Sequence, residues 1–263
     1  MNTYETLRLE AISDHLMVVH LDRPEARNAM NTQMGLDLRD LWQEIYVEQG
    51  DLRCIVVTGT GDKAFCAGGD LKERNGMTDA QWQRQHAIFE QAMLALLEVP
   101  VPVIAAVNGA AFGGGTEIAL CCDFIYAAER ARFALTEITL GIIPGAMGTQ
   151  NLPRAVGERR AKEIILTGSP FTAEDAFQWG MVNKVCPDDA LLEQTLETAN
   201  RIAENAPLST RRAKRVVSIA KEVDIHSGYA LELEAYNRLV PTEDRLEGVR
   251  AFNEKRRPEF KAR

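Results

Sequence analysis

Two glutamates in this sequence stand where an acid is unusual, and both could move protons. Glu117 follows three consecutive glycines at the expected start of a helix, and Glu137 lies in the otherwise apolar run of residues 133–138. A carboxyl group in an apolar setting has a raised pKa, which suits general acid–base catalysis. Each glutamate also has an ordinary explanation. An acid in the first turn of a helix complements the helix dipole, and an acid in an apolar run can be paired or exposed on one face of a strand.

Two glycine clusters could bring main-chain N–H groups close to a ligand. Residues 64–71 are AFCAGGDL, and residues 108–117 are NGAAFGGGTE. Glycine permits a close approach of the backbone, and a helix start offers unpaired N–H groups with a dipole that favours negative charge. The first cluster alone is explained as well by a strand–helix connection that needs positive φ. The triplet costs up to about 1 kcal/mol per glycine relative to alanine, so packing alone explains it poorly.

Other site motifs are absent or lack their required context. Residues 59–64, GTGDKA, match a dinucleotide-binding fingerprint, but the long helix that this motif must open is interrupted by Gly68 and Gly69. The chain has no GxSxG motif, and its four histidines have neither HExxH nor another metal-ligand spacing. We therefore expect no metal and no redox cofactor.

The elements that must position these residues alternate between short apolar strands and helices. The expected strands are residues 16–21, 54–58, 103–107, 124–128 and 182–185. Thr78 predicts an N-cap for a helix that Pro100 and Pro102 end. Such alternation indicates the α/β class, with ligands bound where loops follow the strands. From residue 188 onward only helices are expected, with a break at residues 205–207. We predict a catalytic core over residues 1–205 and a helical region over residues 206–263.

Composition limits the class of protein. The chain has 263 residues, of which 46% are hydrophobic and 26% charged, and it has a net charge of −8, which argues against nucleic-acid binding. Its five cysteines are an odd number without a CxxC pair, as in proteins of reducing compartments. The first ten residues do not resemble a secretory signal, and no apolar run approaches the roughly 20 residues of a membrane helix. We expect a cytoplasmic protein without membrane contact.

Taken together, three segments resemble the crotonase (enoyl-CoA hydratase/isomerase) family. They are AFCAGGDLKER, AVNGAAFGGGTEIALCCD and ALTEITLGIIPGAMGTQ, and the resemblance extends from DRPEARNAMN at residue 22 to EKRRPEF at residue 254. It implies a spiral of ββα turns and a helical C-terminal region that forms trimers, often paired into hexamers.

The resemblance also implies roles for individual residues. Gly69 and Gly114 match the positions whose N–H groups form the oxyanion hole, and Glu117 and Glu137 match the two catalytic glutamates. The implied substrate-binding positions are Glu25, Ala26, Arg27, Ala67, Gly68, Asp70, Leu71 and Met147. Glu25 stands where the family commonly has lysine. Met147 stands where many hydratases have glycine, and we expect its side chain to reshape the acyl cavity.

The implied activity is that of a hydro-lyase, an enoyl-CoA hydratase acting in the breakdown of fatty or branched acyl chains, with coenzyme A as part of the substrate. We expect the helix dipole to keep Glu117 ionised as the base for water, and burial to keep Glu137 protonated as the proton donor. A double-bond isomerase or a specialised acyl-CoA dehydratase on the same scaffold is the alternative, and a non-catalytic acyl-CoA- or RNA-binding member is a more distant one. The segment LKER with Gly76 and Met77 is similar to methylglutaconyl-CoA hydratases, which indicates a branched substrate.

Overall fold

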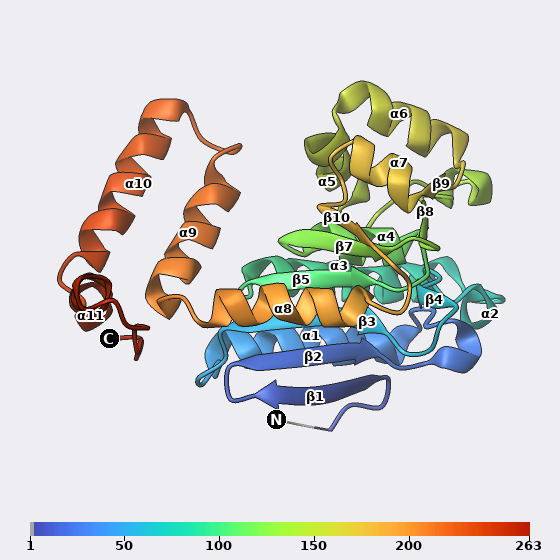
Figure 1. Ribbon diagram of the computed structural model, residues 1–263. Helices are drawn as coiled ribbons and strands as arrows, with labels where there is room; N and C mark the ends of the chain where they lie inside the picture. The colour runs from blue at the N-terminus through green and yellow to red at the C-terminus, as the bar shows by residue number, and fades with distance from the viewer. Residues whose placement is uncertain (1–2) are drawn as a thin grey trace.

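The computed structural model describes residues 3–263 as two sheets surrounded by helices (Figure 1). The larger sheet has the order β1-β2-β3-β5-β7-β10, and the smaller sheet has the order β4-β6-β8-β9. The strands of the larger sheet are β1 (Leu7–Ser13), β2 (Leu16–Leu21), β3 (Cys54–Gly59), β5 (Val103–Val107), β7 (Phe124–Ala128) and β10 (Lys184–Cys186). Those of the smaller sheet are β4 (Ala64–Cys66), β6 (Ala110–Phe112), β8 (Arg132–Ala134) and β9 (Phe171–Thr172).

Successive strand pairs build the fold by repetition. Strands β3, β5 and β7 lie side by side in parallel in the larger sheet, and the strand after each, β4, β6 or β8, pairs in parallel in the smaller sheet. A helical segment follows each of these pairs. Each turn therefore contributes one strand to each sheet, so the loops that leave β4, β6 and β8 converge. The predicted α/β class with ββα turns is confirmed.

The helices before residue 204 surround the two sheets. They are α1 (Thr32–Val47), α2 (Leu71–Arg74), α3 (Asp79–Glu98), α4 (Gly114–Cys121), α5 (Gly148–Val156), α6 (Glu158–Thr167), α7 (Ala173–Gln178) and α8 (Leu191–Ala203), with short 3-10 helices η1 (Pro24–Ala26) and η2 (Glu137–Leu140). Strand β2 is buried on both faces, as expected for a parallel neighbour of β3. Leu16 and Val18 pack with α8, whereas Met17 and Val19 belong to the larger core that α1 and α3 cover.

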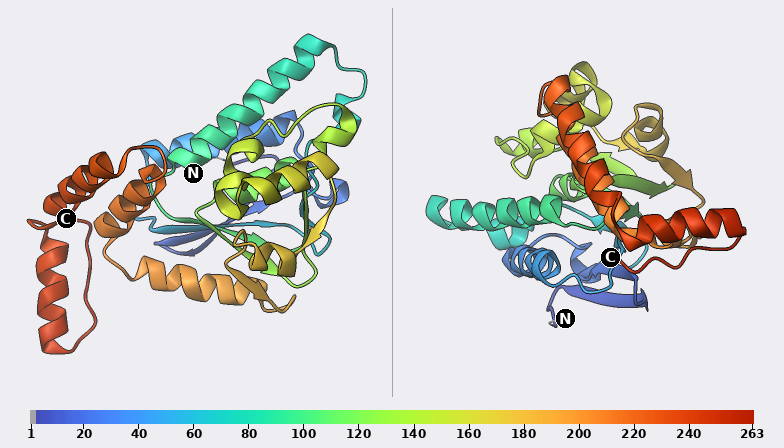
Figure 2. Two further views of the ribbon diagram at one scale, coloured as in Figure 1. Left: turned by 90° about the horizontal axis from the view of Figure 1, so that it is seen from above. Right: turned by 90° about the vertical axis from the view of Figure 1, so that its left-hand side faces the viewer.

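The last three helices form an arm beside this body, which the views of Figures 1 and 2 agree in showing. They are α9 (Pro207–Ile219), α10 (Ile225–Leu239) and α11 (Glu243–Glu254). Lys214 on α9 holds the arm to the body through an ion pair with Asp123 at 2.8 Å. Among residues 3–263, no helix combines the length and the apolar character needed to span a lipid bilayer.

Candidate active site

The glycine triplet places Glu117 at the beginning of α4, close to two other loops. Gly113 adopts φ +50°, and a Cβ on Gly115 would lie 2.1 Å from the carbonyl oxygen of Cys66, so neither position accepts a larger residue without rearrangement. The triplet therefore lets α4 begin directly against the end of β4. This close approach brings the two glycine clusters of the sequence together.

The main-chain nitrogens of Gly69 and Gly114 lie close together where the two clusters meet, and both residues line the same cavity. A Cβ on Gly114 would be 4.0 Å from the Gly69 nitrogen and 3.9 Å from the Gly68 Cα atom. Met30 fixes the loop, because its N–H donates to Gly68 O at 2.7 Å and its carbonyl accepts from the Asp70 N–H at 3.0 Å. Over residues 3–263, neither the Gly69 nor the Gly114 N–H donates to another main-chain group. Both are free to bind a ligand oxygen.

Glu117 is a buried carboxyl group with one oxygen held by the backbone. Glu117 is 3% exposed. The N–H groups of Ala146 and Gly148 donate to its Oε1 at 2.8 and 2.9 Å. Burial, and after it the nearby Glu137 carboxylate, raises the pKa of Glu117 to about 7 against the opposing effect of the two N–H donors. The pKa is therefore shifted in the direction opposite to the one expected from the helix dipole.

Glu137, the first residue of η2, faces the same space three residues after the end of strand β8. Its Oε2 atom is buried and has no hydrogen-bond partner among the described residues. A Cβ on Gly113 would lie 2.8 Å from its Oε1, so the carboxyl group packs on the glycine triplet. Burial raises the pKa of Glu137, against the opposing effects of its own main-chain N–H and of the Arg74 charge. The direction agrees with the expected protonated form.

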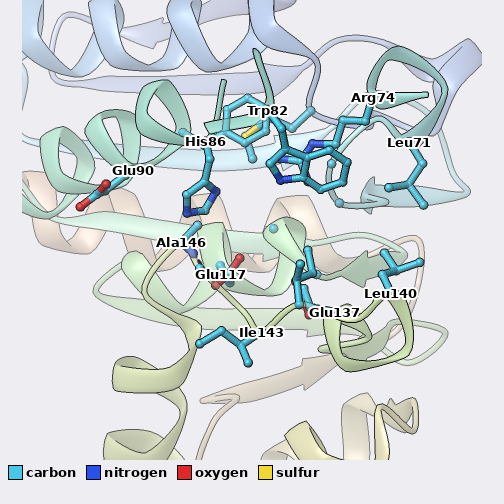
Figure 3. A pocket seen from close by; sticks show the side chains of 18 of the residues that line it. Leu71, Arg74, Trp82, His86, Glu90, Glu117, Glu137, Leu140, Ile143 and Ala146 are labelled. Atoms are coloured by element: carbon cyan, nitrogen blue, oxygen red, sulfur yellow. Dashed lines mark hydrogen bonds between the residues drawn. The ribbon is translucent and has the colours of Figure 1, made fainter. Parts of the chain in front are cut away.

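A cavity of about 690 Å³ joins these groups. Figure 3 shows Glu117, Glu137 and Ile143 on one wall, with Arg74, Trp82 and His86 across from them. The opposite wall comes from α2 and α3, where the lining residues Trp82, His86, Phe89 and Glu90 recur at helical spacing. Two acids and two free N–H donors thus share one largely apolar space, an arrangement suited to charge that develops on a bound carbonyl compound.

Three of the eight substrate-binding candidates line this cavity, and Asp70 adjoins them in the sequence. The three are Ala67, Gly68 and Leu71. Asp70 caps α2 by accepting from the N–H groups of Lys72 and Glu73, and Arg23 pairs with its carboxylate at 3.0 Å. The roles that the sequence suggests for these residues stay predictions.

The η1 loop lies beside the glycine cluster of residues 67–69. Glu25 and Ala26 are part of η1, and the carbonyl of Arg27 accepts from the Ala67 N–H at 3.1 Å. None of these three residues is in the cavity lining, although the loop borders the segment that is. Arg23, which joins this loop to Asp70, was not among the sequence candidates.

Met147, the last of the substrate-binding candidates, lies outside the lining of this cavity. The structure does not bring its side chain to the cavity with the two glutamates. It borders a second cavity beside Cys121 and Asn151. The reason is its left-handed backbone, φ +79° and ψ −2°, which sends the side chain away while the N–H groups on either side turn toward Glu117. This conformation also explains why glycine suits the position.

Sequence reasoning did not identify Arg74 and His86 as cavity residues. Arg74 ends α2, and its position depends on contacts with α3 that the local sequence does not reveal. His86 follows Trp82 by four residues on α3, so helical periodicity could have placed it on the same face.

Comparison with known proteins identifies the family. Residues 11–263 match the enoyl-CoA hydratase/isomerase family, and the chain belongs to it. The chain is 42% identical over 244 residues to a mitochondrial enoyl-CoA hydratase of Pongo abelii, covering 93% of this chain and 83% of that protein. It is 38% identical to a crotonyl-CoA hydratase of Syntrophomonas wolfei, over 98% of each. The crystal structure of an enoyl-CoA hydratase from Bacillus anthracis superposes with a TM-score of 0.96 at 42% identity, over 98% of this chain and 100% of the other. The predicted crotonase-type enzyme fold is therefore confirmed.

Proposed function

We propose that this protein hydrates 2-enoyl-CoA thioesters, with Glu117 and Glu137 as base and acid and the N–H groups of Gly69 and Gly114 as the oxyanion hole. The observation that carries the proposal is the shared cavity. Two carboxyl groups in different surroundings face it together with two unpaired main-chain donors. Relatives named as hydratases support the same reaction.

Water addition needs each of these groups at a defined step. The thioester oxygen accepts hydrogen bonds from Gly69 and Gly114, which stabilise the enolate as it forms. Ionised Glu117 takes a proton from water, the water oxygen bonds to the β-carbon, and the π electrons move toward the thioester oxygen. Protonated Glu137 then gives its proton to the α-carbon, and the thioester carbonyl re-forms. Exchange with solvent returns both acids to their starting states.

Isomerisation of a double bond is the second candidate, because one carboxyl group can move a proton between two carbons. The presence of two acids in one cavity favours hydration, which uses a base for water and a separate donor for carbon. A specialised dehydratase would run the same steps in reverse on a particular acyl group. A non-catalytic or RNA-binding role gains no support from the acidic net charge of −8.

The C-terminal arm supports the predicted homotrimer or hexamer. Helix α10 has no buried residue, and Tyr229, Leu233 and Tyr236 follow one another along one side of it with 60–65% of their area exposed. Apolar side chains of this size in a row are typical of an interface between protein chains. We propose that a second copy of this chain covers them. The cytoplasmic location stays a prediction.

The test of function is loss of the enoyl-thioester absorbance when the purified protein is mixed with crotonyl-CoA, with the product identified by mass. Hydration adds the mass of one water molecule, whereas isomerisation leaves the mass unchanged. A folded protein that produces no hydrated product from any 2-enoyl-CoA chain length would contradict the proposal. A change of double-bond position alone would replace it with the isomerase.

A further inference from the structure

The catalytic cavity contains a permanent cation that water addition does not require. Of the residues from 3 to 263 that line it, Arg74 is the one with a fixed positive charge. It lies partly buried at the end of α2, opposite the wall that carries Glu137. A cation on the path of a purely apolar chain is unfavourable, because covering it removes water without replacing the lost interactions.

Neighbouring side chains hold the Arg74 guanidinium in one orientation. Its Nε atom donates to Gln85 Oε1 at 2.7 Å. Gln85 is 2% exposed, and its own amide donates to Thr32 Oγ1 at 2.8 Å and to Glu73 Oε2 at 2.7 Å. The guanidinium carbon lies 4.3 Å from the centre of the Trp82 ring, within cation–π distance. The group is therefore preorganised before any ligand binds.

The outer edge of this guanidinium stays available. Within the described part of the chain, neither Nη1 nor Nη2 donates to a protein acceptor or lies within ion-pair distance of a carboxylate. Nη1 lies 3.2 Å from the point where a Cβ on Gly69 would stand, so the free edge is beside the proposed thioester site. Glu137 forms no hydrogen bond with Arg74, and in its proposed neutral form it does not compensate the charge of the guanidinium.

We propose that Arg74 selects 2-enoyl-CoA substrates whose short acyl chain ends in a carboxylate. The proposal rests on the proposed hydratase function and names the class of substrate for it. The planar Nη edge matches a carboxylate, which can accept two parallel charge-assisted hydrogen bonds. The fork is already ordered by Gln85 and Trp82, so binding the carboxylate requires little further loss of side-chain freedom.

Binding of unreactive thioesters tests the selection without requiring catalysis. Glutaryl-CoA and pentanoyl-CoA both have five acyl carbons, and they differ in a terminal carboxylate against a methyl group. By calorimetry, the wild-type protein should bind glutaryl-CoA tighter, by on the order of 10- to 100-fold. Arg74→Met should remove the difference, and Arg74→Lys should keep part of it. Arg84→Met, the same change at an exposed arginine of α3, should leave it intact. Equal affinities in the wild-type protein would overturn the proposal.

Reaction rates with the corresponding unsaturated substrates, glutaconyl-CoA and 2-pentenoyl-CoA, separate substrate selection by Arg74 from an effect of Arg74 on catalysis. With glutaconyl-CoA, Arg74→Met should lose on the order of 10- to 100-fold in kcat/KM, while 2-pentenoyl-CoA should change little. Equal losses on both substrates, with a shifted pH profile, would mean that Arg74 acts through Glu137 and would refute the selection. Absence of hydration with both, together with a retained preference for glutaryl-CoA, would refute the proposed function but not the carboxylate site.

Discussion

The body and the C-terminal arm differ in what they do with large apolar side chains. In the body, Trp42, Phe65 and Phe133 are almost completely buried, and Glu137 in the cavity keeps a buried oxygen without a hydrogen-bond partner among the described residues. In the arm, Phe252 is 84% exposed and α10 buries nothing. Because the chain buries its large apolar side chains so completely in the body, their exposure on the arm requires a separate explanation. The difference agrees with our proposal that the body carries out the chemistry and that the arm associates with a second copy of the chain.

The largest effect should come from the two carboxyl groups of the body. Glu117→Gln and Glu137→Gln each keep the shape of the side chain but end proton transfer, so each should reduce hydration by roughly 100- to 10,000-fold. The double variant should cost far less than the product of the two losses, because the groups act as a unit. Initial rates with crotonyl-CoA provide the measurement. Assembly should be unchanged, and normal hydration after loss of either acid would end the two-acid mechanism.

The oxyanion hole should give the next largest effect. Proline is tolerated at the first position of a helix, which is where Gly114 stands, and it deletes the N–H donor. Gly114→Pro should lower kcat by about 100- to 1,000-fold. Gly114→Ala adds a Cβ that meets the flexible end of Met30 at 3.1 Å and keeps the donor, so it serves as the control. Similar rates for the two variants, both folded by circular dichroism, would exclude a role for this N–H.

Substitutions in the arm should change the oligomeric state of the protein. Leu233→Glu combined with Tyr236→Glu places charge in the apolar row of α10, and each change should weaken an interface by about 2 kcal/mol or more. Light scattering should report a trimer or hexamer for the wild-type protein and smaller species for the variant. Tyr46→Glu is the matched control, since Tyr46 is a similarly exposed tyrosine on α1 of the body. A wild-type protein that is monomeric at high concentration would contradict this view of the arm.

A smaller effect concerns the free energy of unfolding, which the buried carboxyl group of Glu117 lowers when it is ionised. Its pKa of about 7 exceeds the ordinary value of 4.5, so the folded state holds the proton more tightly than the unfolded chain. The folding stability that this tighter proton binding contributes is fully present below about pH 4.5 and is lost as the pH rises through about 7. Glu117→Gln should therefore raise the free energy of unfolding at pH 8 by on the order of 2–3 kcal/mol, with a much smaller gain at pH 5. Urea denaturation at one protein concentration measures both. A gain independent of pH would show that ionisation is not the cause.

The smallest expected effect is at Met147. Glycine would relieve roughly 1 kcal/mol of left-handed strain, and loss of the partly buried side chain would offset that gain. Because the side chain borders the second cavity, Met147→Gly should leave the ratio of rates for four- and eight-carbon enoyl-CoA substrates unchanged. A broader range of accepted chains would bring Met147 back to the acyl site.

Local signals in the sequence predicted individual elements well. Thr78 caps α3 as expected, through a capping box with Gln81, and the helix ends at Glu98 before Pro100. The alternating pattern of apolar strands gave the correct class because a strand buried on both faces needs only a short apolar run. These features depend on residues a few positions apart.

Features of the site that depend on distant residues were not predictable from local pattern. Glu117 and Glu137 meet because β6 and β8 are parallel neighbours, a pairing that periodicity does not reveal, and the alternatives for each stayed open until the family resemblance was considered. The surroundings of Glu117 depend on residues 146–148, about thirty positions later, which donate the two hydrogen bonds that oppose its raised pKa. The orientation of Arg74 depends on Gln85 and Trp82, which belong to another helix.

The hydrogen bonds to Glu117 make its two oxygens chemically unequal. Both N–H donors of the turn at Met147 bond to Oε1, whereas Oε2 accepts no hydrogen bond within the described part of the chain. If hydration is the reaction, one atom on one side of the cavity then directs the attacking oxygen, while Glu137 delivers its proton from another fixed position. The planar double bond is thus approached from a single face, and the 3-hydroxyacyl product should be one enantiomer. The handedness of that product would originate in a left-handed backbone turn that touches no substrate.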